Sequence, residues 1–428
     1  MTQKILRGRI LSFTARPENV DDHAAYSYIE DGALCLENGQ IVGMGVFDDM
    51  PQDVEVIDHR PHLLMAGFID THNHFVQMQV IGSYGAQLLD WLQNYTFPAE
   101  TKFIDPDHSA RIATQYFDEM LRHGTTTPVA YCSVHKTSAE AYFNAAAARN
   151  IRAIGGKVLM DRGAPDGLLD TPQSGYDDSV DLIDKWHGTG RALYAISPRF
   201  AITSTPAQLE AAQALVAKNP GCYMQTHLSE NRAEIATTMS LYPQHPDYLG
   251  IYAHYGLLGP RSLLGHAIHL SEWEISVMAE TGSVAVFCPT SNLFIGSGLF
   301  DHARIQNADI PVAIATDIGG GTSYSMLRTL DEAYKVCQLQ GQNLPPLYAF
   351  YMITLGNAKA LGLKDKIGTL DTGTEADIVV LNANATPAMA LRMETVETLA
   401  EELFVLQTLG DDRAIVETYV AGRAVKPV

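Results

Sequence analysis

The stretch GFIDTHNH, residues 67–74, is a short apolar strand that ends in two histidines. Successive side chains of a strand point to opposite faces, so His72 and His74 point to the same face. Seven similar runs follow it, separated by helical stretches, which is typical of parallel strands joined by crossover helices. The eight predicted strands lie at residues 67–71, 125–130, 152–160, 193–196, 222–225, 262–265, 283–287 and 312–315.

Eight strands in about 250 residues have the size of a closed (β/α)8 barrel. We therefore predict an α/β fold in which a TIM-like barrel spans residues 66–365. Three stretches outside the barrel read as short strands with glycine turns, at residues 32–45, 376–382 and 418–425. We expect these stretches to pair with each other, so that residues 1–65 and 366–428 form one small β-sandwich-like domain from both termini.

The net charge of the chain argues against two classes of binding partner. The chain carries 49 acidic and 29 basic side chains, a net charge of -20, which repels nucleic acid and anionic membranes. No apolar run approaches the ~18 residues of a membrane span. We therefore expect neither a nucleic acid nor a membrane as partner.

The cysteines indicate a reducing compartment. The five cysteines are scattered and form no CxxC pair, which argues against a disulfide framework and against a thiolate zinc site. The N-terminal residues lack the long apolar core and the small-residue cleavage site of a secretory leader. We therefore expect reduced, mostly buried thiols and a cytoplasmic protein.

Polar side chains end four of the predicted strands. Strand one ends in His72 and His74, strand five in His227, strand six in His266 and strand eight in Asp317. The strands of a barrel bring their C-terminal ends to one mouth, so these side chains should converge there. Three imidazoles and a carboxylate that leave room for water suit a catalytic divalent cation, with zinc first and iron or manganese admissible. A single buried histidine would more often be a hydrogen-bonded core residue, but the whole set predicts a metal-dependent hydrolase.

Other enzyme classes lack their motifs in this chain. No GxxxxGK[ST], HExxH or GxSxG motif occurs, nor the HxE plus PCxxC pattern of the cytidine-type zinc deaminases. The glycines at 319–321 follow strand eight, where barrels often bind phosphate. A tight turn beside the metal is the favoured interpretation of this run.

Several stretches make the chain resemble the amidohydrolase superfamily. They are GFIDTHNH at 67–74, HLSEN at 227–231, GHAIHL at 265–270, CPTSN at 288–292 and ATDIGGGTSYSML at 315–327. Within the superfamily the chain is most similar to the guanine deaminases. That narrower resemblance depends on QLLDWLQNYTFPAE at 87–100, SPRF at 197–200 and LGDDRAIVETYVAGR at 409–423.

The resemblance implies a ligand set for one zinc ion per chain, formed by His72, His74, His227 and Asp317. Members with two metals bridge them through a lysine that ends strand four, whereas this strand runs into Arg199. Lys157, on strand three, is expected to be structural or to lie behind the ligands. The resemblance also implies a homodimer.

The resemblance further implies how the reaction proceeds. It makes Glu230 the proton shuttle between the attacking water and the ring nitrogen beside the attacked carbon. It places His266 next to that water, where it can stabilise a developing negative oxygen, and Asp317 helps to align the nucleophile. Loss of ammonia from the tetrahedral carbon would convert guanine into xanthine.

The resemblance assigns Gln77, Arg199 and Phe200 to the purine. A guanidinium fork matches the adjacent O6 and N7 acceptors of guanine, whereas adenine presents a donor at position six. The amide of Gln77 can add a hydrogen bond, and Phe200 can pack against the ring. Without a substrate role, Arg199 would form a surface ion pair, Gln77 would be a solvated loop amide, and Phe200 would pack in the core.

Two other functions are compatible with the same residues. One is deamination or dechlorination of another amino-heterocycle, such as a pterin, an oxidised guanine or an aminotriazine, with the same metal and Glu230. The other is a noncatalytic barrel that serves as a binding protein. The second is disfavoured because every residue of the ligand set is present.

Overall fold

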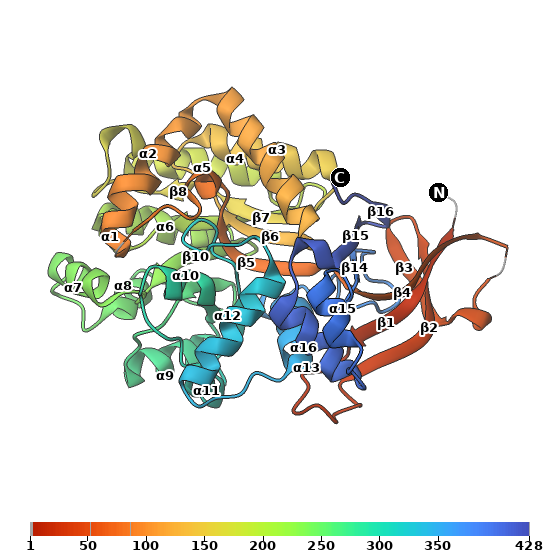
Figure 1. The fold of residues 1–428 in the computed structure, drawn as a ribbon. Coiled ribbons are helices and arrows are strands. Elements are labelled where there is room, and N and C mark those ends of the chain that lie inside the picture. Colours follow the sequence, from red (N-terminus) through yellow and green to blue (C-terminus); the bar gives the residue numbers. More distant parts are fainter. Residues whose placement is uncertain (1–2, 52, 86, 428) are drawn as a thin grey trace.

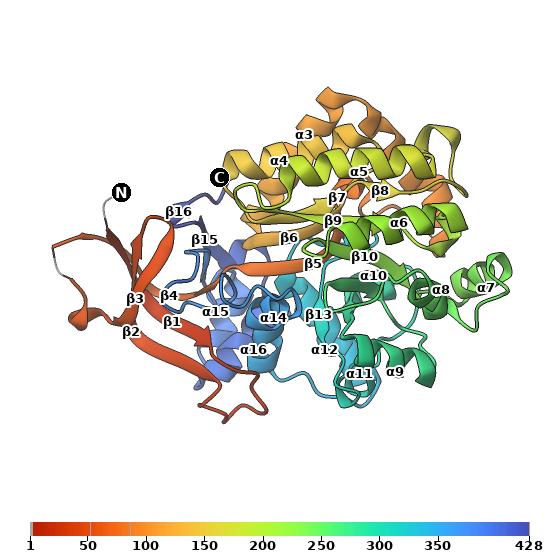
Figure 2. The same cartoon turned by 180° about the vertical axis from the view of Figure 1, so that it is seen from behind.

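The computed structural model describes residues 3–51, 53–85 and 87–427, so the outermost residues of the predicted small domain lie outside it. An eight-stranded parallel sheet curls into a nearly closed barrel (Figures 1 and 2). The predicted (β/α)8 barrel is therefore confirmed. Its strands are β5 (Phe68–His74), β6 (Thr125–Tyr131), β7 (Ala153–Gly156), β9 (Ala192–Pro198), β10 (Tyr223–Leu228), β11 (Ser262–His266), β12 (Val284–Phe287) and β13 (Val312–Ile314).

The third predicted strand is split in two. β7 ends at Gly156, and β8 (Val158–Leu159) resumes beyond Lys157 and pairs with β9. A Cβ on Gly156 would lie 2.0 Å from the carbonyl oxygen of Ala195, so only glycine fits this close approach. The buried ammonium of Lys157 donates to Asp170 at 2.6 Å. Lys157 therefore forms a structural ion pair.

An asparagine side chain joins the first and last strands of the barrel. Asn357, at the start of α14 (Asn357–Ala360), donates to the carbonyls of Ile69 and Ile314 at 2.7 and 2.9 Å. Its Oδ1 accepts from the amide of Ile314 at 2.9 Å. At the mouth of the barrel, the amide of Asp317 donates to the carbonyl of His72 at 2.9 Å. The first and last strands thus present their terminal side chains side by side.

Helices cover the outside of the barrel (Figures 1 and 2). Most of them connect successive strands, as the sequence predicts. The helices that cover the barrel are α3 (Pro106–Arg122), α4 (Lys136–Arg149), α5 (Pro172–Trp186), α6 (Pro206–Lys218), α7 (Arg232–Leu241), α8 (Tyr248–His254), α9 (Glu272–Thr281), α10 (Pro289–Phe294), α11 (His302–Asn307), α12 (Met326–Leu339) and α13 (Pro346–Tyr351).

A continuous helical segment follows β5 and leads to α3. It comprises α1 (Leu88–Trp91), a π-helical turn (Leu92–Thr96), α2 (Phe97–Glu100) and a 3-10 turn (Thr101–Ile104). Leu88, Trp91 and Leu92 line the pocket at the mouth of the barrel. We call residues 88–104 the cover segment, because its apolar side chains form one wall of that pocket.

Both ends of the chain contribute to a second, mixed sheet of seven strands. Its order is β16, β15, β14, β4, β1, β2, β3. The expected stretches at 376–382 and 418–425 pair with each other as β14 and β15, whereas β4 and β1 separate them from the stretch at 32–45 in the strand order. The turn at residues 39–41 nevertheless bonds directly to residues 373–376, for example through the amide of Ala376, which donates to the carbonyl of Gly39 at 2.9 Å. The strands are β1 (Lys4–Phe13), β2 (Tyr26–Glu37), β3 (Gln40–Val46), β4 (Glu55–Ala66), β14 (Ile378–Leu381), β15 (Ile415–Val420) and β16 (Arg423–Ala424).

The C-terminal part of the chain is less β-rich than expected. It also contains α15 (Pro387–Met393) and α16 (Leu399–Leu409), and α16 packs against α12 and α13 of the barrel. The buried side chains of α16 include Leu403 and Leu406. This apolar face attaches the C-terminal region to the barrel as well as to the second sheet.

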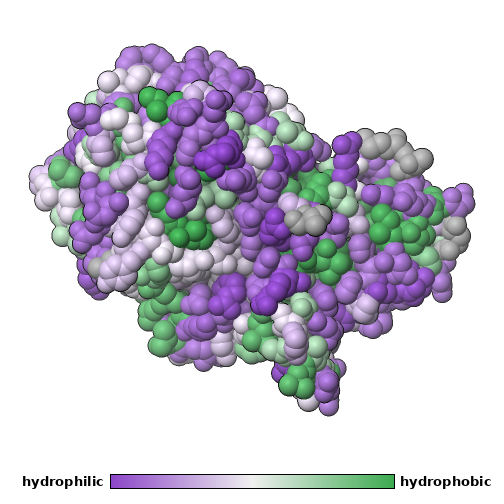
Figure 3. Space-filling model, turned by 45° about the horizontal axis from the view of Figure 1, so that its top comes forward, coloured by the Kyte–Doolittle hydropathy of each residue, from purple (hydrophilic) through white to green (hydrophobic). Residues whose placement is uncertain are grey.

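The surface of the molecule is shown by hydropathy in Figure 3. The face of the molecule in Figure 3 is mostly hydrophilic, and hydrophobic residues occur there in small, separate groups. In the described ranges, no helix is both long enough and apolar enough to pass through a bilayer.

Candidate metal centre and substrate pocket

The structure brings the histidines and the aspartate from the strand ends into one cluster. The Nε2 atoms of His74 and His227 lie 3.2 Å apart. Oδ1 of Asp317 lies 3.4 Å from Nε2 of His72 and 3.5 Å from Nε2 of His74. Oδ2 of Asp317 lies 3.8 Å from Nε2 of His266. Several ligand atoms therefore surround one point at the mouth of the barrel.

Unusual backbone conformations position part of this cluster. His266 and Asp317 have φ angles of 70° and 52°, and Ser229, next to Glu230, has 48°. These values lie in the left-handed region, which is rare for residues other than glycine and costs about 1–3 kcal/mol each. The strand ends thus turn sharply into the barrel mouth. The glycines at 319–321 continue the last turn, in which the amide of Gly321 donates to the carbonyl of Asp317.

The protonation states of the cluster suit a cation. Burial lowers the pKa of His74 and of His227 well below 6.5, and neighbouring positive groups add to this effect. Burial alone would raise the pKa of Asp317, but the contact with His72 and the charge of His266 lower it to about 2. Neutral imidazoles beside an ionised carboxylate are the forms that bind a divalent metal.

Hydrogen bonds also leave ring nitrogens available for a metal. Nδ1 of His227 donates to the carbonyl of Arg199 at 2.7 Å, and a carbonyl only accepts, so Nε2 keeps its lone pair. In the part of the chain that the structure describes, both ring nitrogens of His72 and Nδ1 of His74 are buried without a hydrogen-bond partner. Unpaired buried nitrogens are rare and call for a ligand. These residues could therefore hold a divalent cation.

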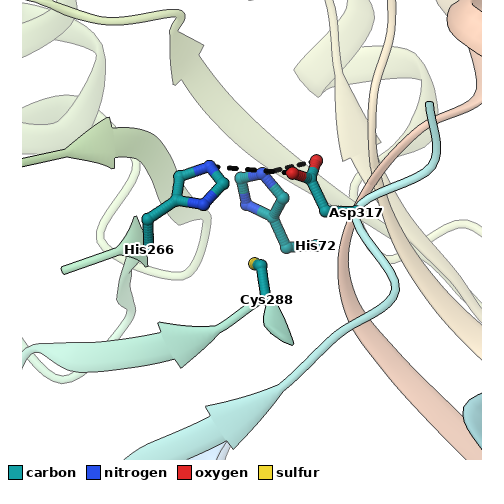
Figure 4. A group of neighbouring side chains, drawn as sticks. All are labelled: His72, His266, Cys288 and Asp317. Atoms are coloured by element: carbon teal, nitrogen blue, oxygen red, sulfur yellow. Dashed lines mark ion pairs between the residues drawn. The ribbon is translucent and has the colours of Figure 1, made fainter. Parts of the chain in front are cut away.

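A cysteine that the sequence did not single out lies beside the cluster. Two overlapping groups have metal-ligand spacing: His72, His74 and His227 in one, and His72, His266, Cys288 and Asp317 in the other. Figure 4 shows the imidazoles of His72 and His266 turned toward the Asp317 carboxylate, with Cys288 at the opposite edge of the two rings. Burial raises the pKa of the Cys288 thiol well above 9, and Asp317 adds to the effect. A neutral thiol is a poor ligand, so the imidazoles and Asp317 are the better donors.

We expect Cys288→Ala to keep its metal. The thiol is buried and neutral, so its removal should leave the metal content per chain unchanged, as measured by elemental analysis of purified protein. His74→Ala is the matched control, because it removes an imidazole from the other group and should lose metal. Loss of metal from Cys288→Ala, with circular dichroism like that of the parent, would show that the thiol is a ligand.

Glu230 lies on the loop after β10, where it is almost completely buried. Its Oε1 accepts from the hydroxyl of Ser297 at 2.8 Å, and its Oε2 lies 3.5 Å from Nε2 of His266. Burial raises the pKa of Glu230, and Asp317 raises it further, against the opposing effects of His266 and Ser297. A carboxyl group with a raised pKa can gain and lose a proton closer to neutral pH.

His266 faces the two carboxylates of the cluster. Nδ1 of His266 donates to Oδ1 of Asn292 at 2.8 Å, which directs Nε2 toward Glu230 and Asp317. Burial opposes a charge on this ring, but the two carboxylates outweigh it and raise the pKa of His266. The ring can therefore present an N–H at the centre of the site.

Next to the cluster lies a pocket with about 390 Å³ of space, which includes the open solvent at its mouth. Gln77, Arg199 and Phe200 all line it, together with Glu230 and residues of the cover segment. Phe200 is also in edge-to-face contact with His227, at 6.1 Å between ring centroids. The residues expected to bind the substrate thus lie beside those expected to hold the metal.

Sequence reasoning missed three side chains that hold the site together. Asn292 and Glu100 lie inside the stretches CPTSN and QLLDWLQNYTFPAE, so those stretches contained a signal that was not used. Ser297 lies in a loop after α10 and contacts Glu230 across 67 positions of sequence. No local pattern indicates such a contact.

A second buried carboxylate, Glu234, gives the stability of the protein a pH dependence. Its Oε2 accepts from the amides of Glu230 and Asn231 at 2.8 and 3.0 Å. Burial and the charge of Glu230 raise the pKa of Glu234 from 4.5 to about 7. A raised folded-state pKa stabilises the protein below pH 4.5, and this stabilisation is lost as the pH rises toward 7.

We therefore expect Glu234→Gln to be more stable than the parent above neutral pH. The amide can still accept from the two backbone groups, and it avoids a buried charge that costs about 3 kcal/mol. Urea denaturation at acid and at alkaline pH measures the difference in free energy of unfolding. The two proteins should be equally stable at acid pH. A Glu234→Gln protein that is less stable than the parent at alkaline pH would contradict the raised pKa of Glu234.

The chain is similar to known proteins of one family. The chain matches the Amidohydrolase family over residues 63–425. It is 46% identical to the guanine deaminase of Escherichia coli K12 over 99% of this chain and 98% of that enzyme, and 36% identical to a probable guanine deaminase of Deinococcus radiodurans over the same shares.

Solved structures of guanine deaminases are also similar to this chain. The fold superposes on E. coli guanine deaminase with a TM-score of 0.96 at 46% identity, covering 99% of both chains. It superposes on the guanine deaminase of C. acetobutylicum, solved with guanine in its active site, with a TM-score of 0.89 at 29% identity. That match covers 99% of this chain and 100% of the other.

Proposed function

This chain belongs to the amidohydrolase family, and we propose that it is a guanine deaminase, which hydrolyses guanine to xanthine and ammonia. The observation that carries the proposal is the pocket itself, in which Arg199 and Gln77 lie beside Glu230 and the histidine cluster. The 46% identity to the E. coli enzyme over nearly the whole chain supports the same reaction.

We place one zinc ion per chain among the side chains of His72, His74, His227 and Asp317. Iron(II) or manganese(II) would suit the same donors. Zinc, when bound, lowers the pKa of a coordinated water toward ~7 and so supplies a nucleophile near neutral pH. The neutral imidazoles and the ionised carboxylate of this cluster support the assignment.

Glu230 moves the proton. Its carboxylate takes a proton from the attacking water and delivers it to the ring nitrogen beside the attacked carbon. The hydrogen bond from Ser297 holds one oxygen, which leaves Oε2 for this transfer. Nε2 of His266 donates to the oxygen on which negative charge develops. The hydroxyl on the tetrahedral carbon then gives its remaining proton through Glu230 to the amine, the C–O bond becomes a carbonyl, and the C–N bond breaks to release ammonia.

Arg199 and Gln77 recognise the base. Arg199 gives one of its five N–H donors to Glu100 and keeps the others for the O6 and N7 acceptors of guanine. Gln77 likewise gives one amide hydrogen to Glu100 and keeps the second for the base. Phe200 packs against the purine ring. Adenine would oppose Arg199 with a donor at position six.

The test is ammonia release and the ultraviolet change on adding guanine to protein of known metal content. Conversion to xanthine with one zinc per chain is the expected result. Turnover of a pterin, an oxidised guanine or an aminotriazine instead would keep the metal chemistry and overturn the role of Arg199. Metal-free protein after chelator-free purification, with no turnover of any of these rings, would favour a noncatalytic barrel.

We also propose a homodimer in the cytoplasm. The dimer follows from the resemblance to the family, and the location from the reduced state of the thiols. All five cysteines are free and buried, which supports a reducing compartment. Light scattering of purified protein at several concentrations tests the dimer, and cell fractionation tests the location.

A further inference from the structure

Glu100 is a completely buried carboxylate in the wall of the substrate pocket. It ends α2 in the cover segment, and the mechanism above does not use it. Its Oε1 accepts from Nε2 of Gln77 at 2.8 Å, and its Oε2 accepts from Nη1 of Arg199 at 2.7 Å. One carboxylate therefore holds both side chains proposed to read the base, although one follows β5 and the other follows β9.

The bond to Gln77 decides which way its amide faces. A carboxylate only accepts hydrogen bonds, so the amino group of Gln77 must face Glu100. The amide oxygen then points toward the backbone N–H of Gly319, at 3.4 Å. Without Glu100, the amide could turn and offer its oxygen to the base instead of a donor. Glu100 thus selects the pattern of hydrogen bonds that Gln77 presents.

The bond to Arg199 cancels a buried charge. The guanidinium of Arg199 is 3% exposed, and a guanidinium buried to this extent is costly without a partner. With Glu100 ionised, the pair carries no net charge, so a neutral base meets a neutral wall. An anionic base would be attracted by the guanidinium of Arg199 but repelled by the carboxylate of Glu100.

We propose that Glu100 is a positioning residue that makes the pocket selective for neutral purines. It orients Gln77 and Arg199 toward guanine, and it weakens the binding of anionic purines. The product is such an anion, because xanthine loses a ring proton near neutral pH. Glu100 thereby also favours release of the product. The inference depends on the proposed function, since it concerns the same pocket.

The first experiment compares the parent with Glu100→Gln, both as full-length, metal-loaded protein. We expect kcat/KM for guanine to fall about 10- to 100-fold, mainly through KM, because a charge-assisted hydrogen bond is lost. Because neutral xanthine keeps O6 and N7, its inhibition at about pH 6 should weaken together with guanine, whereas at about pH 9, where xanthine is anionic, inhibition should be about tenfold stronger relative to that at pH 6 than it is in the parent. If Glu100 had only a structural role, Glu100→Gln would weaken the binding of guanine and of xanthine by the same factor at both pH values.

Glu100→Asp separates charge from geometry. The shorter side chain keeps the negative charge but reaches Gln77 and Arg199 less well. We expect it to lose affinity for guanine while it keeps weak inhibition by the xanthine anion. If Glu100→Asp instead gains the strong inhibition seen with Glu100→Gln, charge cancellation is not the cause.

A double-mutant cycle with Arg199→Met tests whether Glu100 acts through Arg199. In the Arg199→Met background the Glu100 carboxylate has lost its cationic partner, so Glu100→Gln should there raise kcat/KM for guanine and strengthen inhibition by the xanthine anion, whereas in the parent background it lowers kcat/KM. Equal, additive losses in both backgrounds would overturn the proposal. The double variant contains no unpaired buried charge, so it provides the comparison even if Glu100→Gln alone fails to fold.

The parent protein separates this inference from the proposed function. If the parent hydrolyses another heterocycle but not guanine, the proposed function fails, and the cycle is measured on that heterocycle. If the parent converts guanine and the Glu100 variants keep parental kcat/KM and xanthine inhibition at both pH values, the inference fails alone.

Discussion

Replacing Glu230 by Gln is expected to lower kcat for guanine by about 10³- to 10⁴-fold and to leave the metal content unchanged. The amide has the same shape and can still accept from Ser297, whose hydroxyl lies 2.8 Å from Oε1 in the parent. It cannot take a proton from water or deliver one to the ring. Because Glu230 is not placed among the metal ligands, the ion should remain bound.

Ammonia release under saturating guanine, together with elemental analysis, measures both parts of this expectation. Glu234→Gln is the matched control, since Glu234 is another buried carboxylate four residues further along the chain. Its kcat should stay within about threefold of the parent. A Glu230→Gln protein that keeps most of its activity would remove Glu230 from the proton-transfer role, and loss of metal would place it among the ligands.

Replacing Arg199 by Met is expected to lower kcat/KM for guanine by about 10²- to 10³-fold. Methionine fills much of the same space but cannot donate to O6 and N7. It also leaves the Glu100 carboxylate buried without its cationic partner, and that carboxylate would repel the acceptor atoms of guanine. For heterocycles without this acceptor pair, kcat/KM should fall much less.

Comparing several substrates in one variant protein makes this test specific. A general loss of folded protein lowers kcat/KM for every substrate by the same factor, whereas loss of recognition changes their ratio. Arg162→Met is the matched control, because Arg162 donates to the carbonyls of Ala201 and Ile202 and does not line the pocket. Equal losses for all substrates in Arg199→Met would make Arg199 a structural residue.

The barrel could be predicted from local sequence because strand and helix periodicities are short-range properties. Each of the eight predicted runs corresponds to a strand, although the third is split at Lys157. The order of the second sheet could not be predicted in this way. One of its pairings, between β4 and β14, joins strands from the two ends of the chain, and nothing in the strands near residues 32–45 or 376–382 indicates that β4 and β1 lie between them.

The histidines and Asp317 could be selected from the sequence because barrel topology places every strand end at one mouth. Glu100 could not be selected in the same way. It does not follow a strand, and its role depends on how the cover segment folds back over the ends of β5 and β9 to meet Gln77 and Arg199.

The sequence by itself therefore determined the barrel and the side chains that end its strands, since these depend on periodicity and on a topology that repeats, and its resemblance to the amidohydrolases indicated the reaction. Only the tertiary structure decided which side chains support them. Ser297 holds Glu230, Asn292 directs His266, and Glu100 joins Gln77 to Arg199. These contacts connect loops and helices that are far apart in the chain, and hydrogen bonds of this kind exist only once packing has brought their partners within 3 Å.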